Sequence, residues 1–333
     1  MTAPLLDVRG LTVRFHSRRS SATAVDDVSF SLAAGEVLCI IGESGSGKSV
    51  TMRALMRLLP ERRAEISGRI GLDGNDVLSL GDRALNALRG DTVSMVFQEP
   101  MTALDPVFTI GDQIAETVRR HRGASRAEAE ARALELLKLV RIPSPERRLR
   151  AYPHELSGGL RQRAMIALAL SCQPKLLLAD EPTTALDATV QIQVLVLLKR
   201  LQAEIGMGIV FVTHDLGVAA QIADKVAVMY AGRIVEYGPA RDVLLDPRHP
   251  YTIGMLSSTV RGQPRDRDIE AIPGSPPDLA ALPPGCAFAP RCRFAVDACR
   301  AALPPVEEVG PGRSARCARL AAARPAAAAA APA

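Results

Sequence analysis

The chain has 333 residues, of which 47% are hydrophobic and 23% charged, a composition typical of a globular protein with a substantial core. No apolar run reaches the roughly 18 residues of a membrane-spanning helix, and the N-terminus lacks the basic start and apolar stretch of a signal peptide, so we expect a cytoplasmic protein. The net charge of +5 comes from scattered arginines rather than a basic stripe with aromatics, which argues against a nucleic-acid partner.

Apolar alternation in the N-terminal part predicts strands at residues 5–15 and 24–32, forming an antiparallel edge sheet. A short apolar strand at 37–41 leads into a glycine-rich loop, and residues 49–59 continue as a helix.

The central part alternates buried strands with helices, which predicts a parallel sheet covered on both faces and an α/β fold. The predicted strands are 93–97, 176–179, 208–212 and 225–230, and the predicted helices are 187–205 and 215–223. Residues 110–121 and 125–140 have helical periodicity and predict a helical insertion at about 100–170.

Composition changes after Pro239. Residues 240–320 are rich in Pro, Arg and Ala and hold four of the six cysteines, and residues 321–333 are almost entirely Ala and Pro. We therefore expect one domain at 1–239, an extension at 240–320 and a disordered tail at 321–333.

The glycine-rich loop after strand 37–41 matches the pattern G-x-x-x-x-G-K-[ST] of a phosphate-binding P-loop. In such a loop the backbone N–H groups point at the phosphates, Lys48 reaches the β- and γ-phosphates, and the Ser49 hydroxyl binds Mg²⁺. The alternative is an ordinary glycine-rich turn, which the flanking strand and helix disfavour. The predicted nucleotide-binding residues here are Gly42, Glu43, Ser44, Gly45, Ser46, Gly47, Lys48, Ser49 and Val50.

Two adjacent carboxylates, Asp180 and Glu181, end the apolar strand 176–179. Acids at the end of a buried strand are costly unless a metal or ligand uses them. The alternative is that these acids have no functional role and only face solvent at the end of the strand. That alternative accounts for a single acid but is less suited to two adjacent ones.

The P-loop, the Leu156-Ser157-Gly158-Gly159 turn that opens a helix, and the strand ending in Asp-Glu together resemble the ATPase subunits of the ABC family. That resemblance implies an ABC-type P-loop fold with a mixed core sheet, an antiparallel edge subdomain and a helical insertion. It also implies that Asp180 holds Mg²⁺ and that Glu181 polarises the attacking water.

Two further polar residues match family positions after buried strands. Gln98 matches the glutamine that contacts Mg²⁺ and the attacking water, and its segment QEPMTALDP is close to that of peptide importers. His214, in VFVTHD, matches the histidine that contacts the γ-phosphate, although a lone histidine is more often a structural surface residue. Phe15 stands where the family places an aromatic ring on adenine; packing in the core is the alternative.

The Ser157-Gly158-Gly159 turn implies a site completed by a second subunit. In the family this turn is presented to ATP bound by the partner, and Asp187 links the two sites across the interface. As a purely structural feature, the same turn is a helix N-cap. Leu160 replaces the usual glutamine of the motif, a variation that also occurs in peptide importers.

Four clustered cysteines, separated by five, six and seventeen residues, suggest metal ligation because disulfides are disfavoured in the cytosol. Cys39 falls in an apolar strand and Cys172 in an apolar predicted helix, and both are predicted to be plain buried thiols. Spacing alone does not identify the metal. The run from Ile272 to Cys292 is similar to the C-terminal extension of oligopeptide and dipeptide importer ATPases, which implies a [4Fe-4S] cluster, with zinc or free thiols as alternatives. The four cysteines are Cys286, Cys292, Cys299 and Cys317.

This resemblance implies an ATP-hydrolysing, Mg²⁺-dependent subunit that energises import of dipeptides or oligopeptides. Its expected partners are a second ATPase subunit that is a paralogue of this chain, two transmembrane permeases and, indirectly, a solute-binding protein. The expected location is the cytoplasmic face of a bacterial inner membrane. Import of another solute such as nickel or glutathione, a soluble ABC ATPase of translation or DNA repair, and an exporter ATPase are the alternatives. The last two usually carry fused domains or membrane spans that this chain lacks.

Overall fold

A computed structural model describes residues 3–17, 21–183, 186–258 and 271–322. The chain divides into two compact units, each made of several segments. The first unit comprises Met1–Asp7, Ser31–Val37 and Gly71–Val212, and the second comprises Val8–Phe30, Leu38–Ile70 and Thr213–Ala333. The tail predicted to be disordered lies outside the described residues from Ala323 onward.

The first unit contains three parallel strands whose residues are all buried. They are β6 (Val93–Val96), β7 (Leu176–Asp180) and β8 (Gly208–Thr213), with β8 reaching one residue into the second unit. Val93 pairs with Leu176, and Leu176 pairs with Gly208, so the carboxyl ends of the three strands meet at one edge. This register places the residues that follow each strand side by side.

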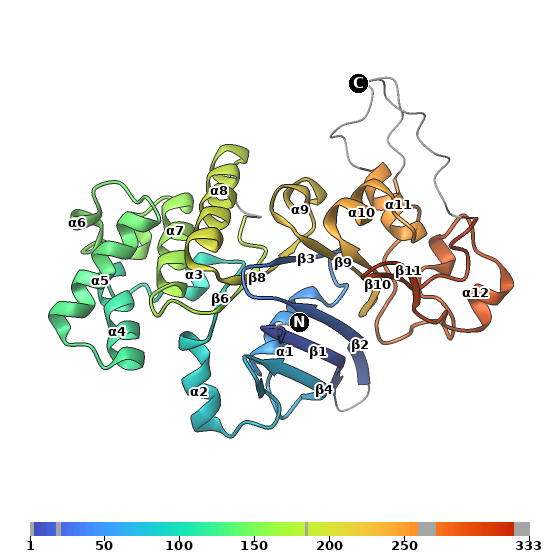
Figure 1. Cartoon of the computed structure of the whole chain (residues 1–333), viewed down its shortest axis with the longest axis horizontal. Helices are drawn as coiled ribbons and strands as arrows, with labels where there is room; N and C mark the ends of the chain where they lie inside the picture. Colours follow the sequence, from blue (N-terminus) through green and yellow to red (C-terminus); the bar gives the residue numbers. More distant parts are fainter. Residues whose placement is uncertain (1–2, 18–20, 184–185, 259–270, 323–333) are drawn as a thin grey trace. The chain divides into compact units, whose positions relative to one another are not determined.

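Helices surround these strands and build a separate helical cluster (Figure 1). The helix α4 (Ile110–Arg122) is capped by the Thr109 side chain, and α5 (Arg126–Leu139) begins at a capping box formed by Ser125 and Glu128. The two helices pack side by side. The remaining helices of this unit are α2 (Asp82–Asp91), α3 (Pro100–Ala103), α6 (Pro145–Arg148), the 3₁₀ turn η1 (Pro153–Glu155), α7 (Gly158–Ala169) and α8 (Ala188–Ile205).

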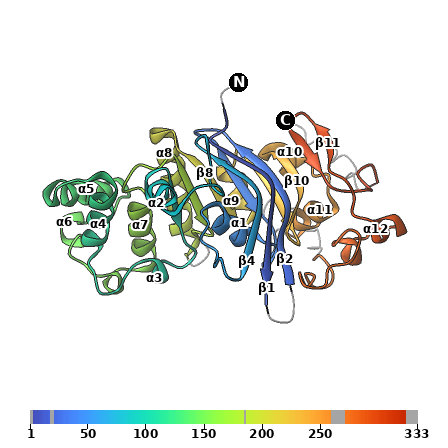
Figure 2. The same ribbon diagram turned by 90° about the horizontal axis from the view of Figure 1, so that it is seen from below.

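The second unit contains most of a sheet that Figure 2 shows edge-on, in which β2 (Ser21–Leu32), β1 (Leu6–His16) and β4 (Ala64–Leu72) are neighbours. The short strand β5 (Asn75–Asp76) pairs antiparallel with the end of β4. Helix α1 (Lys48–Leu55) follows strand β3 (Val37–Ile41) and the glycine-rich loop.

A second set of strands in this unit joins the P-loop strand to the C-terminal extension. Strand β3 pairs parallel with β9 (Lys225–Tyr230), which pairs antiparallel with β10 (Arg233–Pro239). Two short C-terminal strands, β12 (Arg313–Ala315) and β11 (Glu307–Gly310), continue from β10 in antiparallel pairing. The other elements here are α9 (Leu216–Ile222), α10 (Ala240–Leu245), α11 (Pro250–Ser257), η2 (Ala289–Arg291) and α12 (Asp297–Ala301).

Most predicted elements are confirmed to within a few residues, and β3 and β9 match their predicted bounds. The helix predicted at 49–59 is wrong at its end: it stops at Leu55, because Arg57 adopts a left-handed φ of 48°. Cys172 lies in the turn after α7 rather than within the helix, but it is buried as predicted, and so is Cys39. None of the helices in the described ranges is long and apolar enough to cross a membrane.

Candidate functional site

The P-loop in the second unit depends on glycines at positions where a side chain does not fit. A Cβ at Gly42 would lie 2.2 Å from the Met229 carbonyl oxygen, and one at Gly47 would lie 2.4 Å from the Ala24 carbonyl oxygen. Gly45 meets no such obstacle but has a φ of +77°, which L-residues rarely adopt. The loop therefore turns tightly onto α1, as a backbone cradle for phosphate must.

The N-terminus of α1 is suited to bind an anion. Its N-cap residue is Gly47, no side chain caps the helix, and no acidic residue lies in its first turn. The buried Lys48 ammonium donates to the carbonyl oxygens of Gly42, at 2.8 Å, and Glu43, at 2.9 Å. Lys48 is thus held against the loop, and Ser49 follows it in the same turn of helix. A phosphate entering the cradle would meet both side chains from this one turn.

In the first unit, the carboxylates and the glutamine predicted from sequence come together at the ends of β6 and β7. Asp180 is 2% exposed, at the last position of β7. Glu181 is held by a hydrogen bond from its backbone N–H to the Val212 carbonyl, 3.1 Å, and the Gln98 amide donates to the Glu181 carboxylate at 3.4 Å.

The backbone at Glu181 is strained. Its φ of 45° lies in the left-handed region, which is rare for residues other than glycine, asparagine and aspartate. Such strain persists only where the surroundings fix it, and it is concentrated at functional sites. The strained backbone thus belongs to the residue whose carboxylate accepts the hydrogen bond from Gln98.

His214 and Phe15 both belong to the second unit. His214 is exposed and follows β8 directly, while Asp215 caps α9 by accepting hydrogen bonds from the Gly217 and Val218 N–H groups at 2.7 and 3.3 Å. The cap fixes the start of α9 and leaves the His214 ring at the surface. Phe15 is partly exposed near the end of β1, so it is not a core residue.

The signature turn is placed at the start of α7. Ser157 is the N-cap residue of α7, yet its side chain makes no capping hydrogen bond, and it is exposed. The cap interpretation therefore accounts for the backbone of Ser157 but not for its hydroxyl. Gly159 lies against the first turn of α8, where a Cβ would come 2.7 Å from Val190 Cγ1.

Asp187 begins α8 on the other side of this contact. Its carboxylate accepts hydrogen bonds from the backbone N–H groups of Thr189 and Val190, both at 3.0 Å, and it is exposed. The start of α8, including Val190, thus fixes the position of the signature turn. Ala185, in the predicted Ala-Leu-Asp turn, lies outside the described residues.

The four clustered cysteines line one small cavity of about 10 Å³ in the second unit, together with His249 and Phe288. Cys299 and Cys317 are buried, whereas Cys286 and Cys292 are partly buried. Burial raises the pKa of Cys286 and Cys292, and it raises that of Cys317 to about 11, so these thiols stay protonated unless a cation stabilises the thiolate. Among the described residues, no three or more His, Cys, Asp or Glu side chains are gathered closely enough to hold a single metal ion.

Two family models match the chain: "ABC transporter" over residues 25–184 and "Oligopeptide/dipeptide transporter, C-terminal region" over residues 235–299. A putative peptide import ATP-binding protein of Brucella melitensis is 53% identical over 328 residues, covering 95% of this chain and 97% of that protein. The oligopeptide transport ATP-binding protein OppD of Salmonella typhimurium is 50% identical over 313 residues, covering 94% of this chain and 93% of OppD. The chain belongs to the ABC transporter family, in its oligopeptide and dipeptide branch.

Solved structures agree with the membership in the ABC family. The ATP-binding cassette MJ0796, in a dimeric post-hydrolysis state bound to ADP and Pi, is 31% identical and superimposes with a TM-score of 0.64 over 71% of this chain and 99% of its own. The ABC transporter protein cbiO1 of Clostridium perfringens is 26% identical, with a TM-score of 0.63 over 73% of this chain and 92% of its own. The predicted ABC ATPase fold and ATPase class are therefore confirmed.

Sequence reasoning missed two residues that contact the P-loop. Tyr251 and Arg291, both from the segment after Pro239, hydrogen-bond to Glu43. Arg291 lies in the run from Ile272 to Cys292 that resembles the peptide-importer extension, and Tyr251 lies upstream of that run. No pattern within either stretch indicates a contact more than 200 positions away in the chain.

Proposed function

We propose that this ABC ATPase energises the import of dipeptides or oligopeptides across a bacterial inner membrane. The observation that supports this most is the combination of a P-loop, a strained Asp-Glu strand end and the cysteine-lined extension in one chain. The extension corresponds to the C-terminal region of oligopeptide and dipeptide transporters, and the relatives named for peptide import align over nearly the whole length.

In the proposed mechanism, the P-loop and the start of α1 bind the triphosphate of ATP, and Phe15 stacks on the adenine. Ser49, Gln98 and Asp180 would hold Mg²⁺, which neutralises charge that develops on the phosphate oxygens. Gln98 holds the Glu181 carboxylate by the hydrogen bond described above, so that Glu181 can orient a water molecule and accept its proton. His214 donates to the γ-phosphate from the end of β8.

In the proposed assembly a second ATPase subunit, a paralogue of this chain, completes the site. Ser157 has a hydroxyl that its own helix does not use, and it lies at a helix N-terminus, where a γ-phosphate is favourably bound. We therefore assign Ser157, Gly158, Gly159 and Asp187 to the ATP held by that partner. One chain alone thus supplies two half-sites.

Two permease subunits are the further partners, and a solute-binding protein delivers the peptide to them. Exposed apolar side chains that follow the Gln98 loop support a docking surface: Met101, Val107 and Phe108 are 45%, 70% and 51% exposed. Apolar groups left in solvent cost free energy that a protein partner would recover. We therefore propose that the chain lies at the cytoplasmic face of the membrane. In this proposal residues 1–239 are the ATPase domain, with the helical insertion at about 100–170, and residues 240–320 are the extension.

We also propose that Cys286, Cys292, Cys299 and Cys317 hold a [4Fe-4S] cluster. Four thiols around one cavity form a donor set that suits such a cluster. Four thiolates can also hold a single zinc ion, so zinc is the alternative occupant of this site. The cluster would tie together the short elements η2, α12 and β12, which the four cysteines lie in or adjoin.

The test of the ATPase assignment is Glu181→Gln. It is expected to retain ATP binding, to abolish hydrolysis and to trap a closed pair of ATPase subunits. The matched control is Glu204→Gln, an exposed carboxylate in the same unit that pairs with Arg200 at the surface. Hydrolysis by Glu181→Gln at the wild-type rate would overturn the assignment.

Substrate class is tested separately, by uptake of labelled dipeptides and oligopeptides in cells that carry the complete transporter. Uptake is expected with the wild-type chain and not with Glu181→Gln. Uptake of nickel or glutathione in place of peptides would reject the peptide assignment while leaving the ATPase assignment intact.

A further inference from the structure

Glu43, the residue after the first glycine of the P-loop, is held at three points. Its backbone N–H donates to the Tyr251 hydroxyl at 2.9 Å, and its carbonyl oxygen accepts from Lys48 at 2.9 Å. Its carboxylate accepts two hydrogen bonds from the Arg291 guanidinium, at 2.7 and 3.0 Å. Two of the three partners come from the segment after Pro239.

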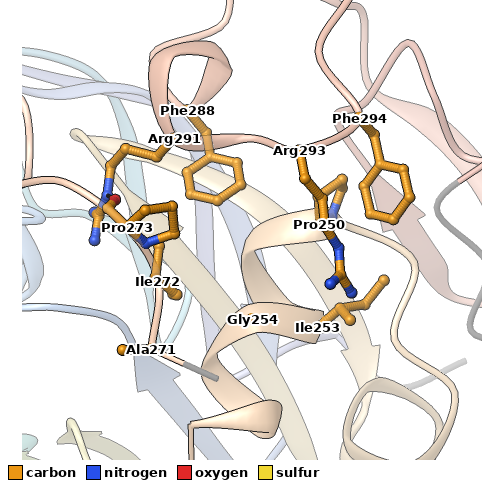
Figure 3. Close-up of a pocket in the computed structure, with 10 residues that line it drawn as sticks. All are labelled: Pro250, Ile253, Gly254, Ala271, Ile272, Pro273, Phe288, Arg291, Arg293 and Phe294. Atoms are coloured by element: carbon orange, nitrogen blue, oxygen red, sulfur yellow. Dashed lines mark hydrogen bonds between the residues drawn. The ribbon is translucent and has the colours of Figure 1, made fainter. Parts of the chain in front are cut away.

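Arg291 is itself fixed in place. It is 9% exposed, its Nε donates to the Pro273 carbonyl oxygen at 2.8 Å, and Nη1 also lies 3.3 Å from the Tyr230 hydroxyl. Figure 3 shows its side chain beside Pro273, at one side of a pocket that Phe288 and Arg293 also line. Because hydrogen bonds to Pro273, Tyr230 and Glu43 hold the guanidinium, its bidentate contact with the Glu43 carboxylate is fixed in one orientation.

The Tyr251 contact is equally rigid. Tyr251 is fully buried at the start of α11, and its ring lies 4.6 Å from Tyr230 and 5.4 Å from Phe288. Phe288 precedes Arg291 in the cysteine-rich loop, so one aromatic cluster positions both residues that reach Glu43. Side chains locked by packing hold a binding site more precisely than side chains on a loose surface.

The negative charge of Glu43 explains why its contact with Arg291 affects ATP binding. A carboxylate within a phosphate cradle repels the triphosphate, and the repulsion is strong where the surroundings are partly buried. The bidentate contact neutralises this charge and turns the carboxylate toward the extension. Removing Arg291 would leave the carboxylate of a P-loop residue without its cation.

We propose that Arg291 is a positioning residue for ATP binding: it acts through Glu43 to set the conformation and charge of the P-loop. The inference rests on the proposed role of the P-loop as the ATP site. In this inference the C-terminal extension contributes to nucleotide affinity, although Arg291 acts on the nucleotide only through Glu43.

The test measures equilibrium binding of a fluorescent ATP analogue to the full chain, for wild type, Arg291→Met, Arg291→Lys, Glu43→Gln and the double variant Arg291→Met/Glu43→Gln. Arg291→Met is expected to weaken binding about tenfold, since one partner of a charge-assisted pair is lost. Arg291→Lys restores the charge without the two-pronged geometry and is expected to recover part of the affinity. The control is Arg300→Met, in the same extension, whose exposed guanidinium pairs with Asp297.

The double variant decides between positioning and general support of the fold. If Arg291 acts through Glu43, removing the carboxylate charge returns binding to within about threefold of wild type, because the repulsion has gone. The KM for ATP hydrolysis is expected to rise in Arg291→Met more than kcat falls.

Wild-type affinity in Arg291→Met, or a double variant as weak as Arg291→Met, would overturn the inference. If Arg291→Met lowers the melting temperature of the nucleotide-free chain, Arg291→Lys with and without Glu43→Gln provides the same comparison. A wild-type chain that binds no ATP would instead refute the proposed function.

Discussion

The carboxylate of Glu236, in β10, is the best buried acid of the described chain, and its removal tests how the extension is held to the rest of the second unit. Its side chain is 0% exposed. One oxygen accepts from Arg313 Nη2 at 3.0 Å and from the Arg248 N–H at 2.8 Å, and the other accepts from the His249 N–H at 2.9 Å. Glu236 thus joins β10, β12 and the residues that begin α11.

The expected loss of unfolding free energy depends on which buried groups each substitution leaves without a partner. Arg313→Met leaves a buried carboxylate without its cation, and such a loss costs about 3–5 kcal/mol of unfolding free energy. Glu236→Gln keeps one oxygen for a backbone N–H, and Arg313 still has Asp246 as a partner at 3.3 Å. We expect Glu236→Gln to cost about 1–3 kcal/mol, the range for one buried polar group that loses a hydrogen-bond partner.

The assay is a double-mutant cycle by chemical denaturation of the full chain. The double variant Glu236→Gln/Arg313→Met removes both charges together, so it is expected to be less destabilised than the sum of the single variants by at least about 1 kcal/mol. Arg300→Met is the control, since Arg300 and Asp297 are 60% and 106% exposed and such pairs contribute at most about 1 kcal/mol. Strict additivity of the two single variants would refute the reasoning, because it would mean that the two charges do not stabilise one another in the fold.

Three further predictions follow from local geometry. Gly159→Ala is expected to lower the melting temperature because its Cβ would strike Val190 at 2.7 Å, whereas Gly158→Ala meets nothing within 4 Å and should leave the melting temperature unchanged. Burial lowers the pKa of His249 to about 3, so between about pH 6.5 and 3 the unfolded chain binds a proton that the folded chain does not. The free energy of unfolding should therefore fall as the pH drops from about 6.5 toward 3, by at most about 1.4 kcal/mol per pH unit. His249→Asn, which can still accept from the Tyr251 N–H, should make this fall less steep. Anaerobically purified chain should contain about four iron and four sulfide per chain if the cluster assignment holds, Cys317→Ser should lower both, and stoichiometric zinc without iron would contradict the assignment.

The central strands and the site residues near them could be predicted because their signals are local. An apolar run such as 225–230 is buried on both faces, and the residues that follow such strands meet at one edge whatever the details of packing. The P-loop likewise carries its geometry in its own glycines. By contrast, the helix after it ends at Leu55 because Arg57 leaves the helical region, and no sequence signal before Pro60 marks that change.

The extension could not be predicted as structure. Its short strands have too few residues to show a period-two pattern. The three residues of β12 are a strand only because they pair with β10, in the register Glu236↔Ala315. The contacts that tie it down join residues far apart in sequence, such as Glu43 with Arg291. Whether two charges so distant meet depends on the register of strands between them, which local propensity does not encode.

The extension is held to the rest of the second unit by three kinds of contact that differ in their physics. The pairing of β12 with β10 supplies backbone hydrogen bonds, the Glu236–Arg313 pair supplies a buried charge contact, and the Tyr251–Phe288 rings supply apolar packing. A surface appendage would need only exposed ion pairs, which contribute little free energy. Phe288 also lines the cysteine cavity, and Tyr251, on which it packs, accepts the hydrogen bond from the Glu43 N–H, so this ring contact links the cavity to the P-loop.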